Sequence, residues 1–484
     1  MLITKPARPA STGTQPAQGG ARPPALSQAD SVRIARYREY LDFYNGYQWE
    51  GLPSPGEKRL TFNYARVFVN KAASYLMGKG VSFAVDPPEG SGNEGKRIAR
   101  HAEGLLRECY ERNSLPLVDL DTAVDSAVLG DGAFKVTWDP DEAAPVVTSV
   151  DPASLTCVRP ADDYRRLLMV TQTYYMSDSG QGTQHDMSDY PGRWAVTPPR
   201  WLITEVWAAD ALEIWRDGVL EKRVPNPYGF IPYVVFPNLR VPREPWGQSD
   251  LVDLMEVNRD LNSRLSVLSH ILEVSGNPIA VLENVTDSTG IKVGPGRLWE
   301  LPRDARAYLL DLLSGGGVGL HIEYINLLYR AMHDLAEMPR TAFGDGAGTT
   351  RSGVALEIEL QPMLQKIARK RAIWTVALEE RSRMILRLHA LHGNHAAAEV
   401  LNPSVGYQLR VVWPPILPSD RTEVVRQETS LVAAGIHSRR RAMDMLGEGD
   451  SEAEWHRVLE EMEMSHSGKR GSTGLSNHEQ QNTA

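Results

Sequence analysis

The sequence predicts an α+β protein in which a region of strands lies between two helical regions. Apolar residues recur every three or four positions before Gly130 and again after Asp250, as on one face of a helix. Between these points they alternate with polar residues, as they do in strands. The chain of 484 residues is too long for one hydrophobic core and predicts roughly two to four structural units.

The composition excludes several classes of protein. With 42% hydrophobic and 23% charged residues, the chain is typical of a soluble globular protein, and no apolar run approaches the ~18 residues of a membrane span. A net charge of −9 argues against a protein that binds nucleic acid over its whole surface, but not against a protein that surrounds DNA. Two cysteines, Cys109 and Cys157, are too few for a disulfide framework, which favours a reducing cytoplasm.

The first expected elements are helical. Residues 1–30 are rich in Pro, Ala, Gly, Ser and Thr, which predicts a disordered arm. Helices are expected over 31–44 and 62–80, and two more over 95–129. The stretch "VSFAV" between them predicts a short strand.

Strands are expected between Gly130 and Asn238. The alternating stretches are "AFKVTW", "PVVTSV", "RLLMVTQTYYM", "WLITEVWA", "ALEIW" and "VLEKRV". Asp217-Gly218, between the last two, favours a hairpin turn because both residues tolerate positive φ. The polar residues 177–193 predict a long loop.

The second helical region begins with a leucine-rich stretch. Ser249 or Asp250 is expected to cap a helix in which leucines recur every three to four residues. A small β region then follows, with strands near 279–282 and 297–301. A helix over 318–337, roughly 28 Å long, completes the pattern.

The longest helix is expected over 352–389. Pro362 should kink it, because proline removes a helical hydrogen bond and clashes with the preceding turn. "YQLRVVW" predicts a strand, and two or three short helices are expected over 419–464. The polar tail over 466–484 predicts disorder.

A glycine-rich segment separates the last two long helices. It reads "PRTAFGDGAGTTRSG" over residues 339–353. Helices that form a simple hairpin need a connection of only about two to eight residues. The longer segment therefore predicts a functional loop, although composition alone also fits a surface loop with no role.

One stretch matches part of a nucleotide-binding loop. "GSGNEGKR" over residues 90–97 has the glycine spacing, but Arg97 stands where a phosphate loop needs Ser or Thr to hold Mg²⁺. Glu94 would place a carboxylate among the phosphates, and no strand–helix–strand pattern surrounds the stretch. We therefore interpret it as a solvent-exposed linker.

Other catalytic and metal-binding patterns are missing from the sequence. It contains no G-x-S-x-G elbow and no H-E-x-x-H pair. His389, His392 and His395 lie close together but straddle the expected end of a helix, which favours a surface helix terminus over a metal site. The sequence thus predicts no catalytic residues, no metal and no cofactor, and hence a protein that is not an enzyme.

The order of the elements resembles a known family. The motifs are "LDFYNGYQW", "FNYARVFVNKAASYLMGKGVSF", "NPYGFIPYVVFPN" followed by "WGQSDL", "RSGVALEIELQPML", and "LVAAGIHSRRRAMDMLGEGDSEAEWHRVLEEME" near the C-terminus. In this order they resemble the portal proteins of tailed, long-tailed bacteriophages and prophages, over roughly residues 31–465. The chain departs from that pattern at residues 344–348, where it is unusually glycine-rich.

The resemblance implies a ring-shaped DNA channel, usually of twelve subunits, with wing, stem, clip and crown. It assigns, in chain order, a disordered arm (1–30), an α+β wing (31–240), a first stem helix (241–273), a clip (274–317), a second stem helix (318–338), a tunnel loop (339–353), a long kinked helix with the return strand of the wing (354–414), a crown (415–465) and a disordered tail (466–484).

The resemblance also implies a function and partners. Double-stranded DNA would be packaged and later ejected through the ring, at one vertex of a capsid assembled in the host cytoplasm. The partners would be the terminase large subunit, the head–tail adaptor, and the major capsid and scaffolding proteins, with no membrane. The tunnel-loop residues expected to face the DNA are Arg340, Thr341, Phe343, Gly344, Asp345, Gly346, Gly348, Thr349, Thr350 and Arg351.

Two clusters of basic residues allow different interpretations. Lys366, Arg369, Lys370 and Arg371 favour ion pairs between subunits over contact with DNA. The run 439–441, three arginines, fits either a surface facing packaged DNA or a solvated helix start. Two alternative functions remain: a DNA-packaging ATPase, which would need a complete phosphate loop, and an unrelated structural adaptor with the same order of elements.

Overall fold

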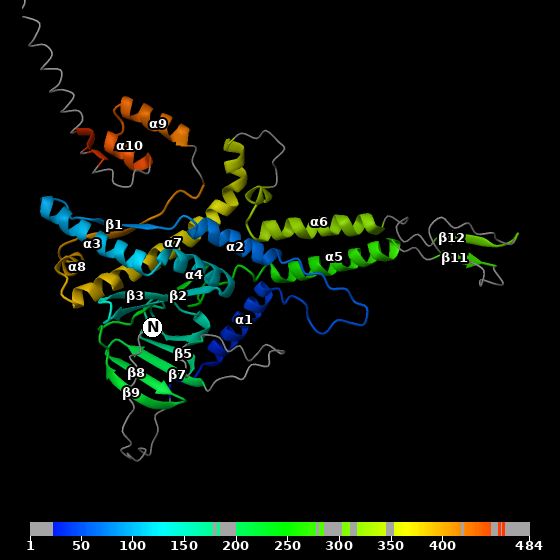
Figure 1. The fold of residues 1–484 in the computed structure, drawn as a ribbon, viewed down its shortest axis with the longest axis horizontal. Coiled ribbons are helices and arrows are strands. Elements are labelled where there is room, and N and C mark those ends of the chain that lie inside the picture. Colours follow the sequence, from blue (N-terminus) through cyan, green and yellow to red (C-terminus); the bar gives the residue numbers. More distant parts are fainter. Residues whose placement is uncertain are drawn as a thin grey trace, which may run out of the picture. The chain divides into compact units, whose positions relative to one another are not determined.

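The computed structural model describes most of the chain in two compact units, residues 1–414 and 415–484. The residues it describes are 23–177, 182–183, 200–276, 280–284, 303–309, 317–344, 353–417, 421–446, 454–455 and 457–459. Figure 1 shows the ribbon with its helices and strands labelled. Helix and sheet are mixed within the first unit, as an α+β protein requires.

The helices of the first unit lie close to the ranges that apolar periodicity predicts. Ser27 begins the first one by accepting a hydrogen bond from the Asp30 amide, and Gly46 at φ +99° ends it. Their bounds are α1 (Gln28–Asn45), α2 (Tyr64–Met77), α3 (Gly92–Arg112), α4 (Leu115–Leu129), α5 (Met255–Gly276), α6 (Gly317–Leu335), α7 (Gly353–Leu391) and α8 (His395–Val400).

The expected linker at residues 90–97 is wrong. Gly92 begins α3, so most of the stretch forms the first turns of a helix. Glu94 and Arg97 form an exposed i,i+3 ion pair at 2.6 Å, which explains both charges without a phosphate. The glycines at 90 and 92 have positive φ and allow the chain to turn into the helix.

The strands form four separate sheets among the described residues. One has six strands with the path β4-β5-β7-β8-β9 and β6 beside β5, one has the order β10-β2-β3, and two are the pairs β1-β13 and β11-β12. The bounds are β1 (Ser82–Asp86), β2 (Asp131–Asp139), β3 (Ala144–Ser149), β4 (Leu155–Val158), β5 (Met169–Ser177), β6 (Gly182–Thr183), β7 (Arg200–Ala208), β8 (Ala211–Arg216), β9 (Val219–Pro225), β10 (Tyr233–Pro237), β11 (Ala280–Glu283), β12 (Arg306–Leu309) and β13 (Gln408–Val412).

The predicted hairpin turn between β8 and β9 is confirmed. Asp217 and Gly218 have φ values of +49° and +80°, so both turn residues are left-handed, as in a type I′ turn. The strands at β4 and β10 have no counterpart in the prediction, and β6 lies within the range predicted as a loop. All strand pairs of the six-stranded sheet are antiparallel.

Helix α7 carries the core of the first unit. The Trp374 side chain is fully buried and packs edge-on against Phe134 of β2 and Phe236 of β10, with ring centroids 6.0 and 4.8 Å apart. About two turns further along α7, the fully buried Arg381 donates to the Asp119 carboxylate and to Tyr110. α7 thus joins the three-stranded sheet to α3 and α4.

Two predicted boundaries in the second half are wrong or lie outside the described residues. α5 begins at Met255, five residues after the expected cap, because Ser249 and Asp250 bind other parts of the chain. The predicted strand near 297–301 lies outside the described residues, and β11 pairs instead with β12 at Arg306–Leu309. Pro362 lies inside α7, and the ribbon of α7 changes direction in its N-terminal part (Figure 1). That Pro362 causes this change stays a prediction.

The second unit contains a pair of short helices within its described residues. These are α9 (Arg421–Ala433) and α10 (Arg439–Leu446), and they pack on each other. A buried Glu428 carboxylate lies 2.8 Å from His437 Nδ1 in the turn between them. Arg439 begins α10, so the run of arginines at 439–441 forms the first turn of a helix.

Candidate functional site at the base of the helical hairpin

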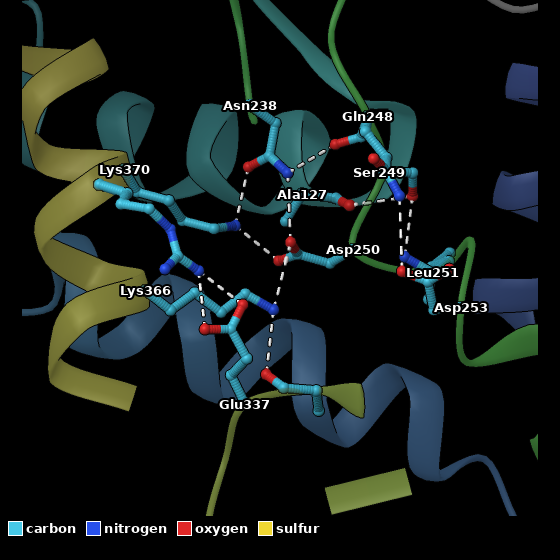
Figure 2. Close-up of polar contacts among 12 residues, drawn as sticks. Ala127, Asn238, Gln248, Ser249, Asp250, Leu251, Asp253, Glu337, Lys366 and Lys370 are labelled. Carbon is cyan, nitrogen blue, oxygen red and sulfur yellow. Dashed lines mark hydrogen bonds and ion pairs between the residues drawn. The ribbon is translucent and has the colours of Figure 1, made fainter. Parts of the chain in front are cut away.

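Asp250 lies at the centre of a buried ion network beside the start of α5 (Figure 2). Its carboxylate oxygens lie 2.5 Å from Lys370 Nζ and 3.5 Å from Lys366 Nζ. The Asn238 amide links two of these groups, since its nitrogen donates to Asp250 at 3.3 Å and its oxygen accepts from Lys370 at 2.8 Å. One carboxylate therefore binds two ammonium groups that α7 presents one turn apart.

The network stabilises the ionised carboxylate. Burial alone would raise the pKa of Asp250, but the charges of Lys366 and Lys370 outweigh it and lower the pKa to about 2. Lys366 Nζ also donates to the Ala336 carbonyl at 3.1 Å, just beyond the end of α6. That end of a helix carries partial negative charge, which offsets the second buried ammonium group.

The turn that contains Asp250 is hydrogen-bonded to the C-terminal end of α4. Ser249 Oγ lies 3.1 Å from the Ala127 carbonyl and 2.5 Å from the Val128 carbonyl, and it accepts a hydrogen bond from the Leu251 amide. A Cβ atom at Gly247 would lie 2.2 Å from the Gly130 carbonyl oxygen, so only glycine fits this approach. These contacts fix the Asp250 backbone before the helix begins.

A second ion pair lies at the outer edge of the network. Glu337 has φ +55° and follows α6, and both of its carboxylate oxygens accept from Arg369 Nη2, at 2.5 and 2.7 Å. Both side chains are substantially exposed, at 37% and 51%, so this pair contributes little stability on its own. The pair nevertheless joins Glu337, in the segment that follows α6, to Arg369 of α7.

The first part of the predicted tunnel loop is packed against the protein. Residues Arg340–Phe343 form a 3₁₀ turn, and the Phe343 ring contacts the rings of Phe68 and His333, each at 5.3 Å between centroids. His333 Nδ1 lies 2.7 Å from the Met338 carbonyl and holds the chain where it leaves α6. The Arg340 guanidinium lies 5.5 Å from the centre of the Tyr329 ring.

The predicted DNA-facing residues therefore fall into two groups. Arg340 and Gly344 are exposed, whereas Thr341 is partly covered and Phe343 is held in the aromatic cluster. Gly344 has φ +84° and ends the 3₁₀ turn. The others lie outside the described residues: Asp345, Gly346, Gly348, Thr349, Thr350 and Arg351.

The basic cluster on α7 has its binding partners within the same chain. Lys366 and Lys370 are buried against Asp250 in their own chain, so the prediction of ion pairs between subunits is wrong for them. Arg369 pairs with Glu337, and Arg371 donates to the Pro414 carbonyl at 2.7 Å. The four charges look alike in sequence, but in the fold two share the Asp250 carboxylate and each of the other two has a partner of its own in the same chain.

The histidines near the end of α7 form no metal site. His392 stacks on Trp138 at 3.7 Å between ring centroids, and His395 lies 3.5 Å from Glu399. Within the described ranges, no group of three or more His, Cys, Asp or Glu side chains could hold a metal ion. In the same ranges, no helix has the length and apolar character needed to cross a bilayer.

The comparisons with known proteins define the class. A family model described as "Phage portal protein, SPP1 Gp6-like" matches residues 26–468, nearly the whole chain. The molecule is thus a phage portal protein, a structural component of the capsid that serves DNA packaging. The chain belongs to the SPP1 Gp6-like portal family. No curated protein matches it.

Sequence reasoning missed the residues that hold the site together. The sequence predicts Asp250 only as a possible helix cap, and Asn238 lies in a motif without an assigned role. Their partners on α7 are 120 and 132 residues away, so no local pattern joins them. One signal was present: two lysines four residues apart on a helix lie on the same face and can share one carboxylate.

Proposed function

We propose that the chain is one subunit of a ring in which α5 and α6 line a central channel for double-stranded DNA. The observation that carries this proposal is the apolar surface that α6 leaves exposed in the single chain. Leu320, Leu327 and Ile322 are 69%, 55% and 46% exposed on one helix. Leu320 and Leu327, seven residues apart, share one face of the helix, and Ile322 lies on the opposite face. Large apolar side chains left exposed in this way mark an interface with another molecule.

We propose the parts of the portal architecture with the bounds that the resemblance implies. The wing is assigned to residues 31–240, the stem to 241–273 and 318–338, the clip to 274–317 and the crown to 415–465, with 354–414 returning to the wing. The packing of α5 along α6 supports the stem (Figure 1), and the β11–β12 pair between them in sequence supports the clip. The separate compact unit at 415–484 supports the crown.

The tunnel loop is proposed to contact DNA beyond Gly344 rather than from Pro339. Phe343 packs in the aromatic cluster, so the chain before it has little freedom to follow a moving partner. Three of the next four positions that the sequence offers at 345–348 are small or glycine, and glycine changes its backbone conformation at low cost. The residues proposed to face the DNA are Asp345, Gly346, Gly348, Thr349, Thr350 and Arg351, with Arg340 at the margin.

The proposed setting is one vertex of a capsid that assembles in the host cytoplasm. The ring would have twelve subunits and would dock the terminase motor and later the head–tail adaptor through the clip. Major capsid and scaffolding proteins would surround the wing. The net charge of −9 supports a channel that DNA passes through, because many phosphate contacts would arrest it.

Electron microscopy of the purified chain tests this function. We expect closed rings with an axial hole, and a reconstruction should place α5 and α6 around the hole. Measured ATP hydrolysis should stay at background, because residues 90–97 form a helix start and not a phosphate loop. Robust turnover would favour the packaging motor, and a monomer at every concentration and salt would favour an unrelated adaptor.

A further inference from the structure

An extended segment of the chain runs along α5 and is held by its side chains. Asn258, Asn262 and Ser266 are buried and recur every four residues, so they form one stripe of the helix. The Ser266 hydroxyl accepts from the Leu60 backbone amide at 2.9 Å, and the side-chain Oδ1 of Asn262 accepts from the Phe62 backbone amide at 2.9 Å. Residues 60–63, which precede α2, therefore lie on α5 as a strap.

The Gln48 side chain completes this attachment. Its amide oxygen accepts from the amide nitrogens of Asn258 and Asn262, each at 2.7 Å, and its nitrogen donates to Asn63 Oδ1 at 2.9 Å. Gln48 is only 3% exposed, so these bonds are shielded from water. Both ends of the intervening chain, which we call the strap loop (residues 49–59), are thus fixed on α5.

The Arg59 guanidinium group makes most of the hydrogen bonds within the strap loop. Arg59 donates to the carbonyl oxygens of Gly51 and Leu52 at 2.8 and 3.1 Å, and it also pairs with Glu57 at 2.8 Å. Glu57 in turn accepts from the Ser54 amide at 2.7 Å. The loop has a defined shape although it lies on the surface.

This ordered loop presents an apolar side chain to solvent. Leu52 is 91% exposed, the highest exposed fraction among the large apolar residues of the described chain. The backbone at Leu52 is held by Arg59, so binding a partner costs less backbone conformational entropy. The loop therefore has the properties of a preformed contact element.

The strap loop and α6 lie on opposite sides of α5. Asn258 and Asn262 hold the strap, whereas Asp260 and Arg264 contact Tyr324 of α6, at 2.8 Å to its hydroxyl and 5.4 Å to its ring. A shift of two residues turns a helix by about 200°, which places the two sets on opposite faces. Figure 1 agrees, with α6 on one side of α5 and the blue loop on the other.

The strap loop and the exposed part of α6 also lie at the same height along α5. The strap passes Ser266, and Lys58 lies 3.5 Å from Glu273. Tyr324 lies beside Asp260 and Arg264, and because α6 runs antiparallel to α5, Leu320 lies one turn nearer to Ser266. In a closed ring, subunits are related by rotation alone, so surfaces that meet must share one height.

We infer that the strap loop of each subunit docks, through Leu52, on the apolar flank of α6 in the next copy of this chain. The inference rests on the proposed ring and identifies one head-to-tail contact within it. A ring needs a different surface on each flank of the subunit, and the single chain has both: an ordered ridge with an exposed leucine, and a helix with Leu320 and Leu327 exposed.

Charge substitutions test the contact. Leu52→Glu and Leu320→Glu should each raise the concentration needed for half-assembly of rings by about tenfold or more, because each places a carboxylate in an apolar contact. Val219→Glu is the matched control, since Val219 is 70% exposed on the β8–β9 hairpin. Mass photometry gives the assembled fraction, and circular dichroism shows that the variants fold.

Cross-linking tests the pairing directly. A short bismaleimide should link a mixture of Leu52→Cys and Leu320→Cys subunits into dimers, and neither variant alone, with the wild-type cysteines as background. A mixture that gives no more links than each variant alone would overturn this contact and leave the ring intact. Rings that tolerate Leu52→Glu as well as Val219→Glu would do the same. A wild-type chain that forms no rings would overturn the proposed function itself, and the contact with it.

Discussion

Removing the charge of Asp250 should destabilise the first unit more than any other single carboxylate change near α5. Asp250→Asn keeps the shape of the side chain but leaves the Lys370 ammonium and the Lys366 ammonium buried without a carboxylate. Breaking a buried ion pair on one side costs about 3–5 kcal/mol. The lowered pKa gives an independent figure: a shift from 3.8 to about 2 corresponds to about 2 kcal/mol.

The assay is denaturant unfolding at several pH values. Asp250 has a lowered pKa in the folded state, so its contribution is complete above pH 3.8 and is lost as the pH falls through about 2. The wild type should therefore lose stability over that window, and Asp250→Asn should lose less. Asp253→Asn, an exposed site three residues on, is the matched control. If the two variants unfolded at the same denaturant concentration, the network would not stabilise the contact between α7 and the turn before α5.

Two further predictions concern neighbouring groups. Burial raises the pKa of Asp131 to about 6, so its contribution to the free energy of unfolding is complete below pH 3.8, and about 3 kcal/mol is lost as the pH rises through 6. Asp131→Asn should remove this dependence of the unfolding free energy on pH. Asp162→Asn, at an exposed site, should leave it unchanged. Phe343→Ala should open the 3₁₀ turn and speed hydrogen exchange of the Ala342 amide about tenfold, because that amide donates to the Pro339 carbonyl only while the turn is packed. Leu356→Ala, at an exposed site on α7, is the control. Unchanged exchange in Phe343→Ala would mean that Phe343 does not hold the turn.

Local patterns predicted the elements well. The helices over 31–44, 318–337 and 352–389 correspond to α1, α6 and α7 because their apolar residues recur with the helical period over many turns. Asp217-Gly218 gave the β8–β9 turn because positive φ at two successive residues is a strictly local demand. Both signals act within a few residues of the chain.

The candidate site could not be predicted because its contacts join distant segments. Lys366 and Lys370 look like solvated helix charges in sequence, and only the fold brings Asp250 between them, 120 residues from Lys370. The same holds for Asn258 and Asn262, which polar composition places on a helix surface but which bind the strap almost 200 residues earlier. Burial of a polar residue depends on its partner, and the partner is not visible locally.

The ion network decides which part of the hairpin can move. Asp250 precedes α5, Ala336 follows α6, and Lys366 and Lys370 belong to α7, so all three helices meet at one carboxylate. Displacing α5 or α7 would break a buried ion pair, and displacing α6 would break the hydrogen bond from Lys366 to the Ala336 carbonyl, so this end of α5 and α6 should be stiff. Phe343 extends this stiffness four residues past Pro339. Residues up to Phe343 should therefore move least while DNA passes, which supports placing the proposed DNA contact beyond Gly344.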